Sequence, residues 1–293
     1  MGRSALFGSF IGGNNPASST GYAEHPPRVG FFTDTSVCIG CKACEVACKE
    51  WNHVPEDGLN FTGMSFDNTV GLSADSWRHV AFIEQPRRSA VNDAGESDCG
   101  PGGKAEMRWL MSSDVCKHCT HAACLDVCPT GALFRTEFGT VVVQEDICNG
   151  CGYCVPACPY GVIDQRKDDG RVWKCTLCYD RLGDEMEPAC AKACPTASIQ
   201  FGPLDDLRDR ASARLAQMHA AGVAEARLYG HDPNDGVGGG GAFFLLLDEP
   251  EVYGLPPAPV VTTSDLPAMW GRAALAAAGL MVGVAAMFVG VRR

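Results

Sequence analysis

Sixteen of the seventeen cysteines fall into four groups of four, here called motifs one to four. Motifs one and three are spaced C-x2-C-x2-C-x3-C, motif two C-x2-C-x4-C-x3-C and motif four C-x2-C-x11-C-x3-C. A cubane cluster needs four thiolates, one for each iron. The sequence therefore predicts four [4Fe–4S] clusters and electron-transfer chemistry. The motifs are Cys38, Cys41, Cys44, Cys48; Cys116, Cys119, Cys124, Cys128; Cys148, Cys151, Cys154, Cys158; and Cys175, Cys178, Cys190, Cys194.

Zinc sites and disulfides are the alternative uses of so many cysteines. Zinc sites typically use two separated C-x2-C pairs, whereas motifs one and three pack three cysteines together, and Pro129, Pro159 and Pro195 follow the last cysteine of three motifs. Disulfide frameworks belong mainly to short secreted chains, and residues 1–30 lack a signal-peptide pattern. The spacing favours clusters over both alternatives.

Three neighbouring cysteines can hold three corners of a cluster, and in two-cluster ferredoxins the fourth comes from the other motif. A turn and a hairpin over residues 133–138 and 141–144 link motif two to motif three, so these two form one pair, and nesting pairs motif one with motif four. The expected ligands are Cys38, Cys41, Cys44 and Cys194 for cluster 1; Cys175, Cys178, Cys190 and Cys48 for cluster 2; Cys116, Cys119, Cys124 and Cys158 for cluster 3; and Cys148, Cys151, Cys154 and Cys128 for cluster 4.

The elements that position these loops predict an α+β fold of two interleaved ferredoxin-like two-cluster modules with one C-terminal transmembrane helix. We expect an N-terminal arm (1–30), an outer module (31–104 and 160–202) and an inner module (105–159). A surface helix, a strand and an extended linker (203–265) then lead to the anchor (266–293). Periodicity predicts the helix over 204–229 and the strand over 242–247, with 253–259 extended.

The predicted anchor contains 19 consecutive uncharged residues, 273–291. As a helix they span about 28 Å, close to the roughly 30 Å of a bilayer core. A buried core helix or a partner-docking helix is the alternative. Gly279 and Gly283 form a G-x-x-x-G pair that lets a second helix approach closely. Arg292 and Arg293 favour a cytoplasmic C-terminus and a cluster domain on the periplasmic or extracellular face, exported with a partner.

Other residues near the motifs have weaker interpretations. Nearby positive charge raises cluster potentials, so the lysines adjoining ligands either tune potential or are ordinary surface lysines. His118 and His121 are expected to hydrogen-bond within the motif two loop rather than to ligate iron. Cys99 fits no motif and is a free thiol of unassigned role. The lysines are Lys42, Lys49, Lys117, Lys174 and Lys192.

Charge and motifs exclude several function classes. A net charge of −11 argues against a nucleic-acid partner. The sequence has no nucleophile motif, P-loop or dinucleotide fingerprint. We therefore expect a non-catalytic protein.

The motifs resemble those of a known family, the beta subunits of membrane-bound formate dehydrogenases. The resemblance runs from about Phe31 to the end, through CIGCKACEVACKEWN, CKHCTHAACLDVCPTGAL, CNGCGYCVPACPYGV, KCTLCYDRL with PACAKACPT, and YGLP before the last helix. Three similar families fit this sequence less well. Nitrate reductase subunits have a tryptophan at one cysteine position, and dimethyl sulfoxide reductase subunits lack an anchor. Anchored hydrogenase relatives usually carry an export signal.

The resemblance implies an electron wire. It would run from a molybdenum- or tungsten-pterin catalytic subunit that oxidises formate to a membrane cytochrome b and quinone, with the last helix in lipid. The alternatives are a hydrogenase wire, a reductase wire running in the opposite direction, and a binding or scaffold protein with structural metal. Iron and sulfide content would separate the last of these.

Overall fold

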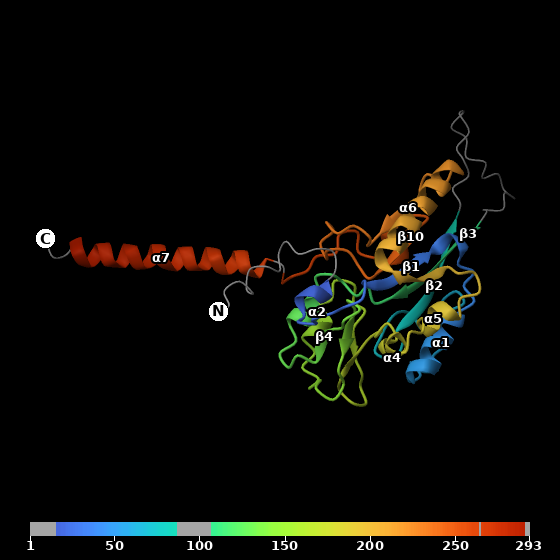
Figure 1. Cartoon of the computed structure of the whole chain (residues 1–293), viewed down its shortest axis with the longest axis horizontal. Helices are drawn as coiled ribbons and strands as arrows, with labels where there is room; N and C mark the ends of the chain where they lie inside the picture. Colours follow the sequence, from blue (N-terminus) through green and yellow to red (C-terminus); the bar gives the residue numbers. More distant parts are fainter. Residues whose placement is uncertain (1–15, 87–106, 264, 291–293) are drawn as a thin grey trace.

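The computed structural model describes residues 16–86, 107–263 and 265–290, which form a body from which one long helix projects (Figure 1). The first half of the predicted N-terminal arm (1–15), Cys99, Arg292 and Arg293 lie outside the described residues. The cluster motifs all lie within the body.

A four-stranded sheet brings the first and last motifs together. Its order is β8 (Ile199–Pro203), β1 (Val29–Asp34), β10 (Ala242–Leu246) and β9 (Arg227–Tyr229). Strand β1 runs antiparallel to β8 and parallel to β10. Because β1 leads into motif one and β8 follows motif four, their pairing places these motifs side by side.

Helix α6 (Leu204–Ala220) covers this sheet through an apolar cluster that includes Phe32, Leu207 and Phe243. The helix is shorter than the predicted 204–229, because the chain turns at Gly222, whose φ is +86°. Residues 227–229 instead form the edge strand β9, whose three residues are too few to show a period. The strand predicted over 242–247 is confirmed as β10, one residue shorter.

Three two-stranded ribbons complete the sheet structure. The longest pairs β2 (Arg78–Pro86) with β3 (Met107–Val115) and leads from motif one to motif two. The predicted hairpin is confirmed, with shorter strands β4 (Leu133–Arg135) and β5 (Val141–Val143). The third ribbon pairs β6 (Asp164–Gln165) with β7 (Val172–Trp173) and lies between motifs three and four.

Eight short helices complete the described part of the body, and four of them, α1, α2, α3 and α5, carry five of the motif cysteines. The eight helices are η2 (Pro16–Ser19), η3 (Thr35–Val37), α1 (Ala43–Asn52), α2 (Ala123–Asp126), α3 (Cys154–Ala157), α4 (Tyr179–Gly183), α5 (Ala189–Lys192) and η4 (Pro250–Tyr253). Helices α1 and α5 are in contact, which joins motif one to motif four a second time.

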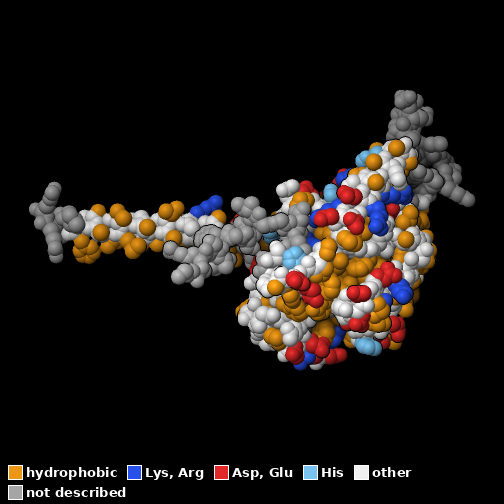
Figure 2. All heavy atoms as spheres, viewed as in Figure 1, with side chains coloured by type: hydrophobic (Ala, Val, Ile, Leu, Met, Phe, Trp, Pro, Cys, Tyr) orange, Lys and Arg blue, Asp and Glu red, His pale blue; other side chains and the backbone are white. Residues whose placement is uncertain are grey.

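Helix α7 (Leu266–Gly290) stands clear of the body (Figures 1 and 2). Its segment Ala268–Phe288 has 21 residues, a mean hydropathy of 1.6 and no buried share. Large apolar side chains such as Trp270, Leu280 and Phe288 are 72–73% exposed. Within the described part of the chain it is the one helix long and apolar enough to cross a membrane, which is compatible with the predicted anchor.

Candidate metal centres

Each motif bends its loop at the same place. The residue just before the second cysteine has a positive φ in all four motifs: Gly40 (+65°), His118 (+44°), Gly150 (+71°) and Leu177 (+58°). For residues other than glycine this left-handed conformation costs roughly 1–2 kcal/mol. Its recurrence shows that the four loops share one backbone bend, which lets neighbouring cysteines face a common centre.

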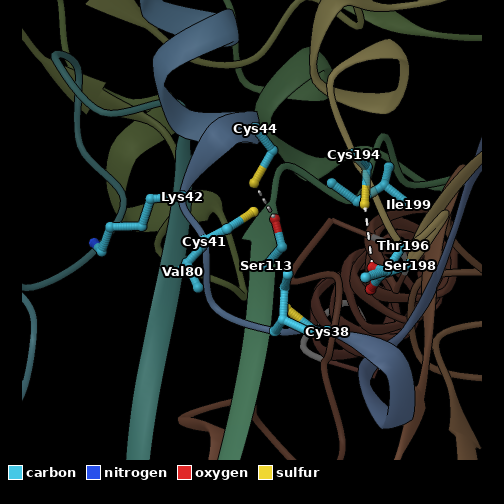
Figure 3. A pocket seen from close by; sticks show the side chains of 11 residues that line it. Cys38, Cys41, Lys42, Cys44, Val80, Ser113, Cys194, Thr196, Ser198 and Ile199 are labelled. Atoms are coloured by element: carbon cyan, nitrogen blue, oxygen red, sulfur yellow. Dashed lines mark hydrogen bonds between the residues drawn. The ribbon is translucent and has the colours of Figure 1, made fainter.

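The first sulfur-lined pocket joins motif one to the last cysteine of motif four (Figure 3). Cys38, Cys41, Cys44 and Cys194 line a space of about 300 Å³ together with Ser113 and Thr196. The Ser113 hydroxyl lies 3.3 Å from Cys44 Sγ, and Thr196 Oγ1 lies 3.8 Å from Cys194 Sγ. These four cysteines are the set predicted for cluster 1.

The second sulfur-lined pocket lies in the motif two loop. Cys116, Cys119, Cys124 and Cys158 line about 370 Å³, with Lys117, His118, Tyr160 and Lys174 also on the wall. Cys158 belongs by sequence to motif three, so the pocket brings together the set predicted for cluster 3. Burial, with the nearby Cys116, Cys158 and Cys154 thiolates, raises the pKa of Cys124 to about 12.

In the remaining two cysteine sets, thiolates raise the pKa of a cysteine of the same set. Burial raises the pKa of Cys48 well above its usual range, and Cys175, Cys190 and Cys178 raise it further. All four of these thiols are buried. Burial likewise raises the pKa of Cys154 to about 12, and Cys128, Cys148 and Cys151 add to the effect. The neighbours are again the sets predicted for clusters 2 and 4.

The donor arrangement fits cubane clusters better than single ions. Among the described residues, no three His, Cys, Asp or Glu side chains approach closely enough to hold one metal ion. Instead, four cysteines line one common space in each of two pockets, which matches the four thiolates that a cubane cluster requires, one for each iron. Metal coordination deprotonates a thiol outright, so a bound cluster would stabilise the thiolates that burial disfavours.

The five predicted lysines do not behave alike. Lys117 and Lys174 are 2% exposed. The Lys174 ammonium donates to the carbonyls of Val141 and Cys175, and that of Lys117 donates to Asp114 and to the Val115 carbonyl. Lys42 and Lys49 are half-buried and form ion pairs with Asp67 and Asp57, whereas Lys192 is exposed. The pattern "lysine beside cysteine" therefore covers three different environments.

The two histidines also differ. His118 is 1% exposed, and its Nδ1 accepts a 3.1 Å hydrogen bond from the Val141 amide. Its Nε2 is buried and has no partner among the described residues, and the ring lies on the wall of the second pocket. His121 is exposed. Only His118 is therefore placed to donate to something inside the pocket.

Arg78, at the start of β2, is a site residue that the sequence interpretation missed. Its side chain is fully buried, and its guanidinium donates through Nη1 to the Ser113 hydroxyl at 2.9 Å. Burial alone would lower its pKa, but the thiolates of Cys190, Cys44, Cys175 and Cys48 raise the pKa above its usual value. Nothing in the sequence marks Arg78, because it lies far along the chain from every motif and starts an ordinary strand.

Comparisons with known proteins agree with this picture. Residues 37–132 and 107–204 each match a family described as a 4Fe–4S dicluster domain. The nitrate-inducible formate dehydrogenase iron–sulfur subunit of Escherichia coli is 39% identical over 264 residues, 88% of this chain and 82% of its own. The formate dehydrogenase iron–sulfur subunit of Haemophilus influenzae is 39% identical over 246 residues, 82% of this chain and 72% of its own. The B subunit of the E. coli anaerobic dimethyl sulfoxide reductase is 35% identical over 183 residues, 62% of this chain and 77% of its own.

Proposed function

This chain belongs to the family of formate dehydrogenase iron–sulfur subunits, and from that premise we propose that it conducts electrons from a formate-oxidising Mo or W catalytic subunit to a membrane cytochrome b and quinone. The chain carries four [4Fe–4S] clusters and is a non-catalytic electron-transfer subunit. The exposure of the thiols supports conduction through the chain. Only two of the four cysteine sets contain an exposed thiol, so these two sets are candidates for the entry and exit of electrons.

The proposed ligation is the cross-ligation expected from the motifs. The cysteine sets of clusters 1 and 3 each line a common pocket. In the sets of clusters 2 and 4, thiolates raise the pKa of a cysteine of the same set. The pairing of β1 with β8 and the packing of α1 on α5 support an outer module built from both ends of the body. The hairpin β4–β5 supports an inner module built from motifs two and three.

The proposed order of the clusters is 1, 2, 3, 4. The Cys190 thiolate raises the pKa of Cys44, which links cluster 2 to cluster 1. The Cys116 thiolate raises that of Cys175, which links cluster 3 to cluster 2. The Cys154 thiolate raises that of Cys124, which links cluster 4 to cluster 3. Each neighbouring pair of sets thus contains thiols close enough to influence one another.

The two motif cysteines that are exposed, Cys41 and Cys151, belong to the first and last sets of this order. The chain that leads into α7 packs on the motif two and three region, where Val261 contacts the apolar cluster of Ala123 and Ala157. Thr263 also donates to Asp126 of α2 at 2.6 Å. Cluster 4 is therefore the proposed membrane end of the wire, and cluster 1 the proposed end for the catalytic subunit.

An apolar surface beside motif one supports a protein partner at that end. Ile39, next to the exposed Cys41, is 58% exposed, and Phe66 is 74% exposed. The Phe66 ring lies 5.7 Å from Phe82 and 5.5 Å from Trp109, so these aromatic groups are contiguous. Exposed apolar patches of this kind mark protein contacts. We assign this surface to the catalytic subunit.

We assign α7 to the lipid bilayer, with the G-x-x-x-G pair facing a cytochrome b helix. A side chain added at Gly279 or Gly283 would meet no other described atom of the chain, so this face is free for another helix. The charge bias of Arg292 and Arg293 supports a cytoplasmic C-terminus and a periplasmic or outer cluster domain. External protease should then digest the body in cells whose outer barrier has been removed but whose inner membrane is sealed; a body left untouched there would overturn this orientation.

The test of function uses the native complex, extracted anaerobically from membranes through a tag on this chain. Formate should bleach the broad iron–sulfur absorbance, and hydrogen in a separate sample should not. Bleaching by hydrogen alone would assign the wire to a hydrogenase. Bleaching by neither, in an intact complex that contains about sixteen irons per chain, would indicate a reductase and reverse the direction of electron flow.

A further inference from the structure

Arg78 lies where the cysteine sets for clusters 1 and 2 meet. Its guanidinium lies over the ring of Phe31, which packs in one cluster with Cys44, from the first set, and Cys48, Cys175 and Cys190, from the second. The thiolates of these four cysteines also raise the pKa of Arg78. It is among the largest side chains that are essentially removed from solvent. A buried cation needs compensation by negative charge or hydrogen-bond acceptors.

Most of its donors lack an acceptor among the residues that the structure describes. Nη1 donates to the Ser113 carbonyl at 3.3 Å and to its hydroxyl at 2.9 Å. Nε and Nη2 are buried and have no partner within the described ranges. The aromatic face of Phe31, 4.9 Å from the guanidinium carbon, is the other neighbour. No carboxylate is paired with Arg78 in the described residues, although Lys42, Lys49 and Arg166 all have one.

Ser113 extends this arrangement toward cluster 1 alone. Its hydroxyl lies 3.3 Å from Cys44 Sγ (Figure 3). The same hydroxyl accepts a hydrogen bond from Arg78 Nη1. A cluster-bound thiolate has no proton to donate, so the Ser113 hydroxyl then donates to Cys44 Sγ while its oxygen accepts from the guanidinium. The orientation of the hydroxyl thus depends on Arg78.

We propose that Arg78 is the shared charge-compensating residue of clusters 1 and 2, and that its guanidinium raises the reduction potential of both. This inference rests on the proposed ligation of these two clusters. Adding an electron increases the negative charge of a cluster, and a fixed, desolvated positive charge favours that state. The planar guanidinium has five donors in a rigid fork, which allows one side chain to serve two acceptors in different directions.

The test compares midpoint potentials in the tagged native complex by anaerobic redox titration with electron paramagnetic resonance. Cys41→Ser and Cys178→Ser identify the signals of clusters 1 and 2. In Arg78→Met both signals should titrate at lower potential, with a roughly tenfold smaller equilibrium constant for reduction, about 59 mV for one electron. Arg78→Lys keeps the charge and should shift both less. Ser113→Ala should lower cluster 1 alone.

Clusters 3 and 4 serve as internal controls and should not move. Four unchanged potentials in an Arg78→Met protein with full iron and sulfide would overturn the proposal. If Arg78→Met loses clusters 1 and 2, the other two variants decide: unchanged potentials in both overturn the proposal, and the expected shifts support it. Iron and sulfide in the unmodified complex test the ligation separately, because a shortfall there contradicts the proposed function before any potential is compared.

Discussion

Arg78, in the region of motifs one and four, and three buried cations in the region of motifs two and three have different kinds of partner. In the first, Arg78 has two nitrogens, Nε and Nη2, without a partner among the described residues. In the second, Lys174 and Lys117 donate to backbone carbonyls and to Asp114, and Arg135 donates to the carbonyls of Gly139, Cys119 and Thr120. The second group of cations therefore fixes loop backbone as well as charge, whereas Arg78 keeps donors available for a bound group.

The prediction with the largest expected effect tests whether paired motifs exchange their last cysteines as cluster ligands. Cys116→Ser and Cys158→Ser should each remove about four of sixteen irons, because both residues are assigned to cluster 3. The double variant should lose no more iron than either single variant. Iron per chain in the purified complex measures this.

The matched comparison is Cys158→Ser with Cys148→Ser, which share motif three but not a cluster. This pair should lose about eight irons. An additive loss in the first pair, combined with a single loss in the second, would show that each motif binds its own cluster. Cys99→Ser, outside every motif, should retain all the iron.

The cysteine sets were the part of the site that spacing could predict, because ligand spacing reflects the geometry of one loop. The hairpin and strand β10 were predictable for a similar reason, since alternation and apolar runs are local. Arg78 and the shortened α6 were not, because their roles arise from contacts with distant segments. Arg78 reaches the cysteines only because the β2–β3 ribbon packs against α1 and lines the pocket that motif one shares with Cys194. The 227–229 segment becomes a strand only because β10 offers an edge.

The next prediction concerns the backbone role of the buried lysines. Lys174→Met should destabilise the protein by about 4 kcal/mol, because it leaves the carbonyls of Val141 and Cys175 without a donor. It should also lower the potential of cluster 3, whose pocket Lys174 lines. The measurements are the apparent melting temperature and the redox titration.

Lys192→Met is the matched control, because Lys192 also lies beside motif cysteines but is exposed. It should change the melting temperature by less than about 1 °C, in keeping with ordinary surface substitutions. Equal effects of the two variants would mean that burial does not separate these lysines, and the contrast between the two regions would fail.

A smaller effect is expected behind motif one, where Asp67 binds Lys42 at 2.8 Å and His79 at 2.9 Å. Although burial opposes it, these partners hold the pKa of Asp67 well below its usual range. Asp67→Asn should cost about 3 kcal/mol, the lower end for breaking a buried pair. Exposed Asp209→Asn is the control.

The sign of the pH dependence follows from the lowered pKa. The stabilisation by Asp67 is fully present above the unfolded pKa of about 3.9 and is lost as the pH falls through the lower folded value. The melting-temperature difference between native and Asp67→Asn protein should therefore stay constant from pH 8 to pH 5. A difference that already disappears at pH 6 would contradict the ion-pair explanation.

The smallest expected effect concerns the backbone bend that the four motifs share before their second cysteine. Motifs one and three, which supply the exposed Cys41 and Cys151, use glycine there, whereas motifs two and four use the buried His118 and Leu177. In the buried loops, side-chain packing offsets the cost of a left-handed residue. In the exposed loops little packing would be gained, so glycine avoids the cost.

Gly150→Ala and Gly131→Ala measure that cost with and without a steric clash. Both glycines have a φ of +71°, so each alanine should cost about 1 kcal/mol in backbone strain. At Gly150 the new Cβ would also meet the carbonyl oxygen of Gly170, whereas at Gly131 it meets nothing within 4 Å. Gly150→Ala should therefore lower the melting temperature more and release iron from cluster 4 faster under a chelator. Equal decreases in melting temperature would mean that the loop around Gly150 relieves the clash by moving. The glycine would then be required for its backbone conformation alone.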